Sequence, residues 1–183
     1  MRLFVALIPS EDAVEHLDAF LEPRRSAAEF RWTRPEHFHI TLAFMADAAP
    51  ARVDDLVDRL AESLDDIAPA DAVLAGAVVF PNAAEGRILA TDVEGEVPLE
   101  RLATRTRNTA VASGIEVDGA RFRPHLTVAR TGGRAVELTS WVRLFETYRG
   151  PAWSADGVEV VASHLCEGPR RTPRYETLAR IEL

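Results

Sequence analysis

The sequence contains one short pattern twice, as His39-Ile40-Thr41-Leu42 and as His125-Leu126-Thr127-Val128. Both stretches are rich in β-branched and apolar residues, and this predicts two strands. Side chains alternate between the faces of a strand, so the histidine and the threonine of each copy share one face. The opposite face of the first strand is expected to be apolar and to carry Phe38, Ile40, Leu42 and Phe44. Each strand therefore offers one imidazole and one hydroxyl to a surface.

Two interpretations of this pattern are open. A single histidine on a strand is more often a structural, hydrogen-bonded residue than a catalyst. The second copy repeats both the polar and the apolar face, and it lies close to half a chain away from the first. Repetition of this kind favours a paired site to which each strand contributes one histidine.

Length and composition limit the class of protein. The chain has 183 residues, of which 47% are hydrophobic, and this predicts one globular domain over residues 1–183, built as two small packed lobes. We find no apolar run long enough to cross a membrane, and the first residues lack the features of a signal peptide. The single Cys166 excludes an internal disulfide and a multi-cysteine zinc site. We therefore expect a reducing, cytoplasmic setting.

The charge distribution points to a small anionic ligand. The net charge of −8 argues against broad binding to polyanions. All 21 basic residues are arginines, whose planar guanidinium groups match phosphate oxygens. Several lie near the two motifs in the sequence: Arg31, Arg34, Arg121, Arg123 and Arg130. A small basic cleft in an acidic protein suits a phosphate ligand or one end of a nucleic acid.

Strands and helices alternate along the chain. Besides the two motif strands, the patterns predict strands over residues 3–8, 30–33, 73–80, 87–93, 156–165 and 175–183. They predict helices beginning at Ser10, over residues 51–67, from residue 99 to Gly114, and within residues 136–148, the last ended by Gly150-Pro151. A basic loop is expected over residues 168–173. Several strands are joined by short turns, which predicts an α+β fold with mostly antiparallel sheet and two similar lobes.

Two imidazoles facing one ligand can share acid–base work. Because free imidazole titrates near neutrality, one ring can accept a proton while the other donates one across a phosphodiester. The two threonine hydroxyls can donate hydrogen bonds to phosphate oxygens. This arrangement requires no metal, and a zinc site is disfavoured because neither motif supplies a carboxylate as a further ligand.

The chain resembles the 2H phosphoesterases, and among them the bacterial and archaeal RNA 2′,3′-cyclic phosphodiesterases, historically called 2′-5′ RNA ligases. The similar stretches are residues 2–7, 31–36, 38–44, 122–130, 163–165 and 175–178. Two positions depart from the family pattern. Met45-Ala46 replaces a usual Leu-Gly, and Cys166-Glu167-Gly168-Pro169 precedes Arg170-Arg171 where the family commonly has a glycine-rich loop.

The resemblance implies a bilobal 2H phosphoesterase-like α+β fold with two pseudo-twofold-related lobes, helices outside and a central cleft. It implies hydrolysis of a 2′,3′-cyclic phosphate to a 2′-phosphate, with His39 as general acid and His125 as general base, although the two roles could be exchanged. Thr41 and Thr127 would hold the phosphate. Further substrate contacts are expected from Arg130, Arg123, Phe4 and Trp32, while Phe44 and Tyr148 are also candidates to stack a base and His164 is a weaker third histidine.

The implied partners are RNA ends or nucleotides that carry a 2′,3′-cyclic phosphate. We expect no cofactor, no metal, no membrane association and a monomeric protein. Two alternatives stay open from the sequence. One is 2′-5′ RNA ligation as the main role, and the other is a non-catalytic module that binds nucleotides or RNA ends.

Overall fold

The computed structural model describes residues 1–168 and 172–183. The strands are β1 Leu3–Leu7, β2 Arg31–Trp32, β3 Ile40–Met45, β4 Ala70–Phe80, β5 Ile88–Gly95, β6 Leu126–Arg130, β7 Arg149–Ala155, β8 Gly157–His164 and β9 Arg174–Glu182. The α-helices are α1 Glu11–Leu21, α2 Val53–Leu64, α3 Leu99–Ala112 and α4 Thr139–Phe145. Within these ranges, no helix has both the length and the apolar character needed to span a membrane. Of the predicted basic loop, Pro169, Arg170 and Arg171 lie outside the described residues.

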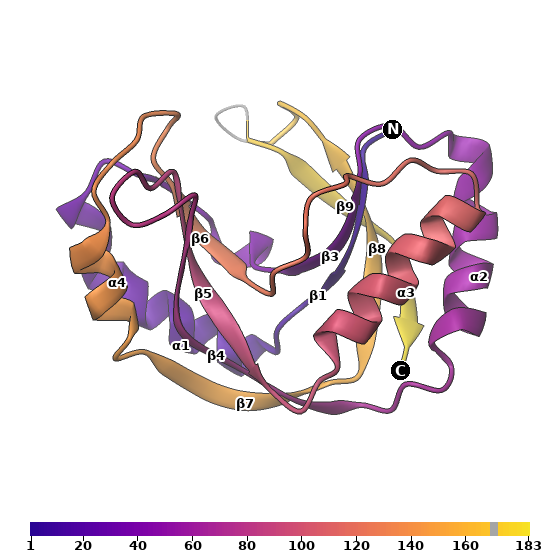
Figure 1. The fold of residues 1–183 in the computed structure, drawn as a ribbon, viewed down its shortest axis with the longest axis horizontal. Coiled ribbons are helices and arrows are strands. Elements are labelled where there is room, and N and C mark those ends of the chain that lie inside the picture. Colours follow the sequence, from indigo (N-terminus) through magenta and orange to yellow (C-terminus); the bar gives the residue numbers. More distant parts are fainter. Residues whose placement is uncertain (169–171) are drawn as a thin grey trace.

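One curled antiparallel sheet forms the framework of the molecule (Figure 1). Its strands run in the order β7-β4-β5-β6-β3-β1-β8-β9, and β2 pairs with β6 beside this path. Strands β3 and β6 meet in the middle, where Ile40 lies opposite Leu126. Four strands of the ordered path therefore stand on each side of the junction, and the predicted α+β fold with two similar halves is confirmed.

Two helices cross from one half of the sheet to the other. Helix α1 follows β1 in the chain but packs against β7, and α3 follows β5 but packs against β3 and α2 (Figure 1). Both connections bury apolar side chains, among them Leu17 of α1 and Leu102 of α3. The two halves are thus held together by helix packing as well as by the strand junction.

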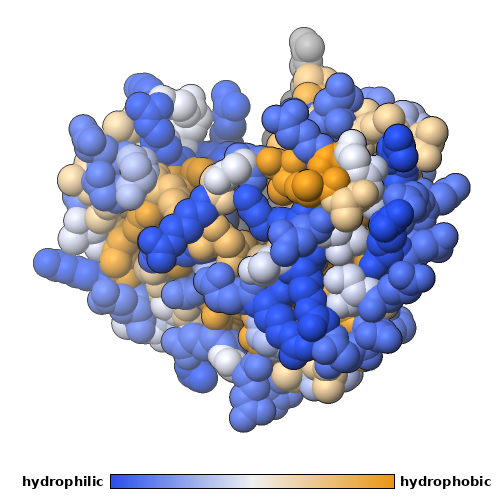
Figure 2. Space-filling view, turned by 45° about the vertical axis from the view of Figure 1, so that its right-hand side comes forward, coloured by the Kyte–Doolittle hydropathy of each residue, from blue (hydrophilic) through white to orange (hydrophobic). Residues whose placement is uncertain are grey.

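Apolar side chains form two clusters on opposite faces of the sheet. Leu3, Val5 and Leu7 of β1 belong to the large core that includes the helices. The alternate residues Phe4 and Ala6 belong to a small cluster that contains no helix residue and is completed by Val161, Phe44 and Tyr175. On the side drawn in Figure 2, hydrophilic side chains cover most of the surface and apolar ones gather in a few patches.

A bulge in β3 changes the predicted orientation of Phe44. Ala43 pairs with Val5 and Thr41 pairs with Ala6, so Leu42 is an extra residue in its strand. The extra residue reverses the alternation beyond it. Phe44 consequently lies in the small cluster, on the face opposite Leu42, and the prediction that both share one apolar face is wrong.

A matching bulge lies in β6. Ala129 pairs with Leu89 of β5 and Thr127 pairs with Ala90, which leaves Val128 as the extra residue. Both Val128 and Ala129 are buried, whereas Arg130 is exposed. The bulge thereby carries Arg130 to the same face of the sheet as Thr127.

The prediction that Gly150-Pro151 ends the fourth helix is wrong. Helix α4 already ends at Phe145, and both residues lie inside β7. Among the described strands, β7 pairs only with β4, so it forms one edge of the sheet. Proline lacks a backbone N–H, but an edge strand needs hydrogen-bond donors on one side only. The edge position therefore accommodates a residue pair that would disrupt a central strand.

The end of β5 closes tightly against β4 at Gly95. The Asp71 carbonyl accepts hydrogen bonds from the N–H groups of Glu96 and Val97, at 2.9 and 3.1 Å. Gly95 has a φ of +119°, and a Cβ on it would collide with the same carbonyl oxygen. We expect Gly95→Ala to lower the free energy of unfolding by about 3 kcal/mol, measured by urea denaturation.

Gly76→Ala is the matched control for this substitution. Gly76 also has a positive φ, +70°, but a Cβ there would meet no atom within 4 Å. This variant should lose only about 1 kcal/mol, the cost of the left-handed conformation. Equal losses in the two variants would show that the close approach to Asp71 contributes nothing.

Candidate active site

The strand junction brings the two His-x-Thr motifs together. Ile40 and Leu126 are paired, and His39 and His125 immediately precede them in an antiparallel arrangement. Extending the register by one residue in each direction gives two further opposed pairs: His39 with Thr127, and Thr41 with His125. Side chains of opposed residues in neighbouring strands lie within contact range. The two imidazoles and two hydroxyls therefore share one face, which we call the motif site.

The two histidines are held by the same local hydrogen bond. Nδ1 of His39 lies 2.7 Å from the carbonyl oxygen of His37, and Nδ1 of His125 lies 2.8 Å from that of Arg123. A carbonyl oxygen can only accept, so each Nδ1 carries the proton and donates it. In the neutral ring, Nε2 is then left as the unprotonated nitrogen. Both rings thus present the atom that could exchange a proton with a ligand.

Aromatic rings fix the orientation of both imidazoles. Phe4 stacks on His39, with ring centroids 4.6 Å apart and planes at 24°. Tyr175 meets the His39 ring edge-on, with centroids 5.6 Å apart and planes at 88°. Phe80 packs against His125 at 4.8 Å and 62°. These contacts limit the movement of both rings before any ligand binds.

Burial and neighbouring charge lower the pKa of both histidines. The pKa of His39 is lowered to about 4, chiefly by desolvation and then by repulsion from the charged forms of His37 and His125 and from Arg130, while the hydrogen bond to the His37 carbonyl opposes the shift. The pKa of His125 is also lowered, first by burial and then by Arg130 and Arg123. At neutral pH both rings are therefore uncharged in the free protein. Arg130 lowers the pKa of both histidines, so its positive charge lies near both motifs.

Both predicted arginines lie at the motif site. Arg130 reaches its face through the β6 bulge, and Arg31 of β2 lies directly opposite it across the strand pair. Arg123 is exposed, and its guanidinium carbon lies 5.6 Å from the centre of the Phe80 ring. Positive charge is thus concentrated beside two neutral imidazoles.

Of the predicted aromatic contacts, the structure brings Phe4 to the motif site but not Trp32. Trp32 lies opposite Ala129, a residue of the large core. Its ring packs against Phe30 and Trp141, and its indole N–H donates to the Arg25 carbonyl at 3.2 Å. The bulge in β6 explains this placement, because beyond Val128 it turns Ala129, the partner of Trp32, toward the core instead of toward the face of Thr127.

Tyr148 is also remote from the motif site. It is buried, and its ring packs against Phe20 and Phe145. Its hydroxyl lies 3.2 Å from Nδ1 of His16. Tyr148 therefore belongs to the packing of α1 and α4 and does not face the two motifs.

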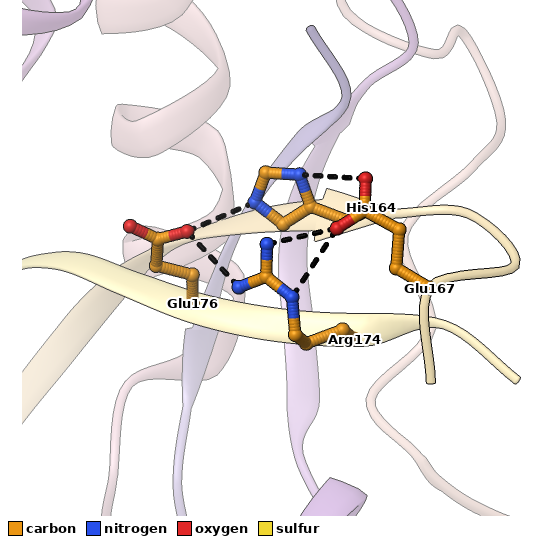
Figure 3. A network of polar contacts seen from close by, with 4 residues as sticks. All are labelled: His164, Glu167, Arg174 and Glu176. Atoms are coloured by element: carbon orange, nitrogen blue, oxygen red, sulfur yellow. Dashed lines mark hydrogen bonds and ion pairs between the residues drawn. The ribbon is translucent and has the colours of Figure 1, made fainter. Parts of the chain in front are cut away.

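His164 belongs to a separate polar network at the ends of β8 and β9 (Figure 3). Its Nε2 lies 3.0 Å from a carboxylate oxygen of Glu176. Arg174 contacts both Glu167 and Glu176, at 2.9 and 3.2 Å. The network joins the two strand ends next to Tyr175, and the third histidine considered from the sequence is not part of the motif site.

Two residues of the motif site were missed from the sequence, Phe80 and Tyr175. Both reach the site from strands that do not carry a motif, β4 and β9. Tyr175 also sits beside His37, with ring centroids 4.6 Å apart. Tyr175 lies in a stretch that resembles the family, but the resemblance assigns it no role, and Phe80 is marked only as an aromatic residue at a strand end, which is too common to identify a site.

The lowered pKa values give a direct test of the site. Protonation of either ring is disfavoured in the folded protein, so NMR titration should show His39 titrating near 4 and His125 below 6.5. Replacing Arg130 removes a positive charge, and Arg130→Gln should raise both pKa values. Arg143→Gln on α4 makes the same charge change away from the site and should leave them unchanged. Titration of either motif histidine at or above 6.5 in the unsubstituted protein would contradict this description.

Known proteins are similar to this chain in sequence and in fold. Residues 7–90 match the family described as LigT like phosphoesterase. An RNA 2′,3′-cyclic phosphodiesterase of Geobacillus stearothermophilus is 28% identical over 182 residues, covering 98% of this chain and 56% of that protein. The chain thus spans little more than half of this relative. An enzyme of the same name from Archaeoglobus fulgidus is 28% identical, covering 80% of this chain and 82% of that protein.

Solved structures show the same fold over the full chain. A protein of Thermus thermophilus superposes with a TM-score of 0.77 at 25% identity, covering 100% of this chain and 98% of that one. E. coli LigT in complex with 3′-AMP also gives a TM-score of 0.77, at 20% identity, with coverage of 100% and 97%. Residues 7–90 are therefore similar to the LigT like phosphoesterases, and the whole chain shares the fold of these solved structures.

Proposed function

We propose that this protein hydrolyses 2′,3′-cyclic phosphates at the ends of RNA or on nucleosides, and that the product is the 2′-phosphate. The observation that carries the proposal is the matched pair of imidazoles, each held by an Nδ1–H bond to a carbonyl and each opposite the other motif's threonine. The substrate class is supported by the relatives named RNA 2′,3′-cyclic phosphodiesterase.

The motif site suits a singly charged phosphodiester. The Thr41 and Thr127 hydroxyls are positioned to donate hydrogen bonds to the non-bridging oxygens, and the exposed Arg130 supplies a positive charge beside them. An anion placed between the imidazoles favours their charged forms, because it offsets burial and the charge of Arg130. Substrate binding is thereby coupled to uptake of one proton by the histidine pair.

The reaction then needs two proton transfers. Nε2 of His125 accepts a proton from a water molecule whose oxygen attacks phosphorus. The bond between phosphorus and the 3′ oxygen breaks, and protonated His39 donates its Nε2 proton to that oxygen. The product carries a 2′-phosphate and a 3′-hydroxyl, and exchange with solvent restores the starting protonation. Both proton transfers run between a ring nitrogen and an oxygen atom.

The environment of His39 fits the role of the acid. Its pKa is about 4 in the free protein, so it becomes the acid only after the bound phosphate has raised that pKa and the ring has taken up a proton. His125 is neutral at pH 7 and available as a base, since its pKa is also lowered. When the reaction runs backwards the two roles exchange, because each ring then returns the proton that it took up or takes back the one that it gave.

Substitution of the two histidines tests this proposal. His39→Ala and His125→Ala should each reduce turnover of adenosine 2′,3′-cyclic phosphate by roughly 10²–10⁴-fold, because each removes one proton-transfer group. His164→Ala serves as the control, since His164 lies in the network of Figure 3 outside the motif site. The assay is run in EDTA, and the product isomer is identified by chromatography.

Three results would contradict the proposal. The first is a 3′-phosphate product, which would mean that the bond from phosphorus to the 2′ oxygen breaks and not the bond to the 3′ oxygen. The second is loss of turnover in EDTA, which would require a metal. The third is full activity in both histidine variants. Formation of mainly 2′-5′ joined RNA from limiting substrate would assign ligation as the main role instead.

A further inference from the structure

Two arginines, Arg121 and Arg123, precede His125 in the segment 121–125, and we call this segment the arginine strip. These residues lie between α3 and β6, outside any helix or strand. Arg121 and Arg123 are exposed, while the intervening Phe122 is partly buried. Arg123 lies two residues before His125 and Arg121 four residues before it, in the same segment. Four residues span at most about 14 Å, which keeps Arg121 near the site.

A hollow of about 530 Å³ lies at the far end of this strip. One wall is the face of α3 that carries Glu100, Thr104, Arg107 and Asn108, and the other is formed by residues 119–122. Its volume is within the range of small-ligand sites. The chain forming the second wall is anchored near the motif site, because the Asp118 N–H donates to the Phe44 carbonyl at 2.9 Å.

The arginines of the strip and the hollow are available for an anion. Many arginines of this acidic protein contact carboxylates, for example Arg105 with Asp66 and Arg149 with Glu94. Within residues 1–168 and 172–183, no ion pair is formed by Arg107, Arg121 or Arg123. The guanidinium of Arg107 donates to the Asp118 carbonyl and is held in place beside the hollow.

We propose that this hollow, together with Arg121, binds phosphodiester groups of the RNA strand on the 5′ side of the terminal nucleotide. The inference rests on the proposed function, in which the cyclic phosphate occupies the motif site. A cyclic phosphate ends the strand, so the remaining chain must leave the site in the 5′ direction. Guanidinium groups pair with phosphate oxygens, and Phe122 lines the hollow where a base could stack. The preferred substrate is thereby an oligoribonucleotide and not a mononucleotide.

Two substrates that differ only in length test the proposal. Adenosine 2′,3′-cyclic phosphate fills the motif site alone, while a short oligoadenylate ending in the same group also reaches the hollow. The unsubstituted protein should have a lower KM for the oligomer. Arg121→Glu should raise that KM roughly tenfold and leave kcat and the mononucleotide kinetics unchanged.

Two further variants give a control and an effect of opposite sign. Arg143→Glu reverses a charge on α4, away from α3, and should change neither substrate (Figure 1). Glu100 places a carboxylate in the hollow, where it repels phosphate. Glu100→Gln should therefore lower the KM for the oligomer and leave the mononucleotide unaffected.

Binding of a fluorescent oligoadenylate, followed by anisotropy, needs no turnover. Arg121→Glu should weaken binding and reduce the slope of log affinity against log salt concentration by about 1. An unchanged slope, an unchanged oligomer KM, or equal losses on both substrates would overturn the inference. Turnover of both substrates with no dependence on length would overturn it while leaving the proposed function intact. Absence of turnover with length-dependent binding would instead overturn the proposed function alone.

Discussion

The pairing of β3 with β6 at Ile40 and Leu126 is the contact on which the arrangement of this molecule depends. It joins the two halves of the sheet, and its register sets each motif histidine opposite the other motif's threonine. A shift by one residue would turn one motif toward the core, because side chains alternate between faces. The crossing helices α1 and α3 reinforce this junction, since each packs on the half of the sheet that it does not follow.

The two bulges make a nearly symmetric site chemically unequal. Leu42 and Val128 occupy equivalent places in β3 and β6, one residue after the motif threonine. Each bulge turns the residue two positions after its extra residue toward the face of the motif site. In β3 that residue is Phe44, which packs in the small apolar cluster, and in β6 it is the exposed Arg130. The residue that follows the bulge is therefore aromatic in one half of the motif site and basic in the other.

The sequence predicted local features well and long-range geometry poorly. Apolar periodicity located α2 and α3, and the repeated motif identified the two strands that meet, because both signals are local. The orientations of Phe44 and Trp32 depended on bulges, which leave no mark in a pattern of alternating residues. Phe80 and Tyr175 reach the histidines from strands without a motif, so only the folded sheet reveals them. Gly150-Pro151 was misassigned because a strand's place at the sheet edge is not encoded locally.

The central claim is that both imidazoles act on a single phosphate group. A crystal structure with a bound nucleoside 2′-monophosphate tests it most directly, because that molecule is the expected product. We expect its phosphate to lie between His39 and His125, within hydrogen-bond distance of Nε2 of both rings and of the Thr41 and Thr127 hydroxyls. A phosphate that contacts only one histidine, or that binds on another face of the sheet, would contradict the account.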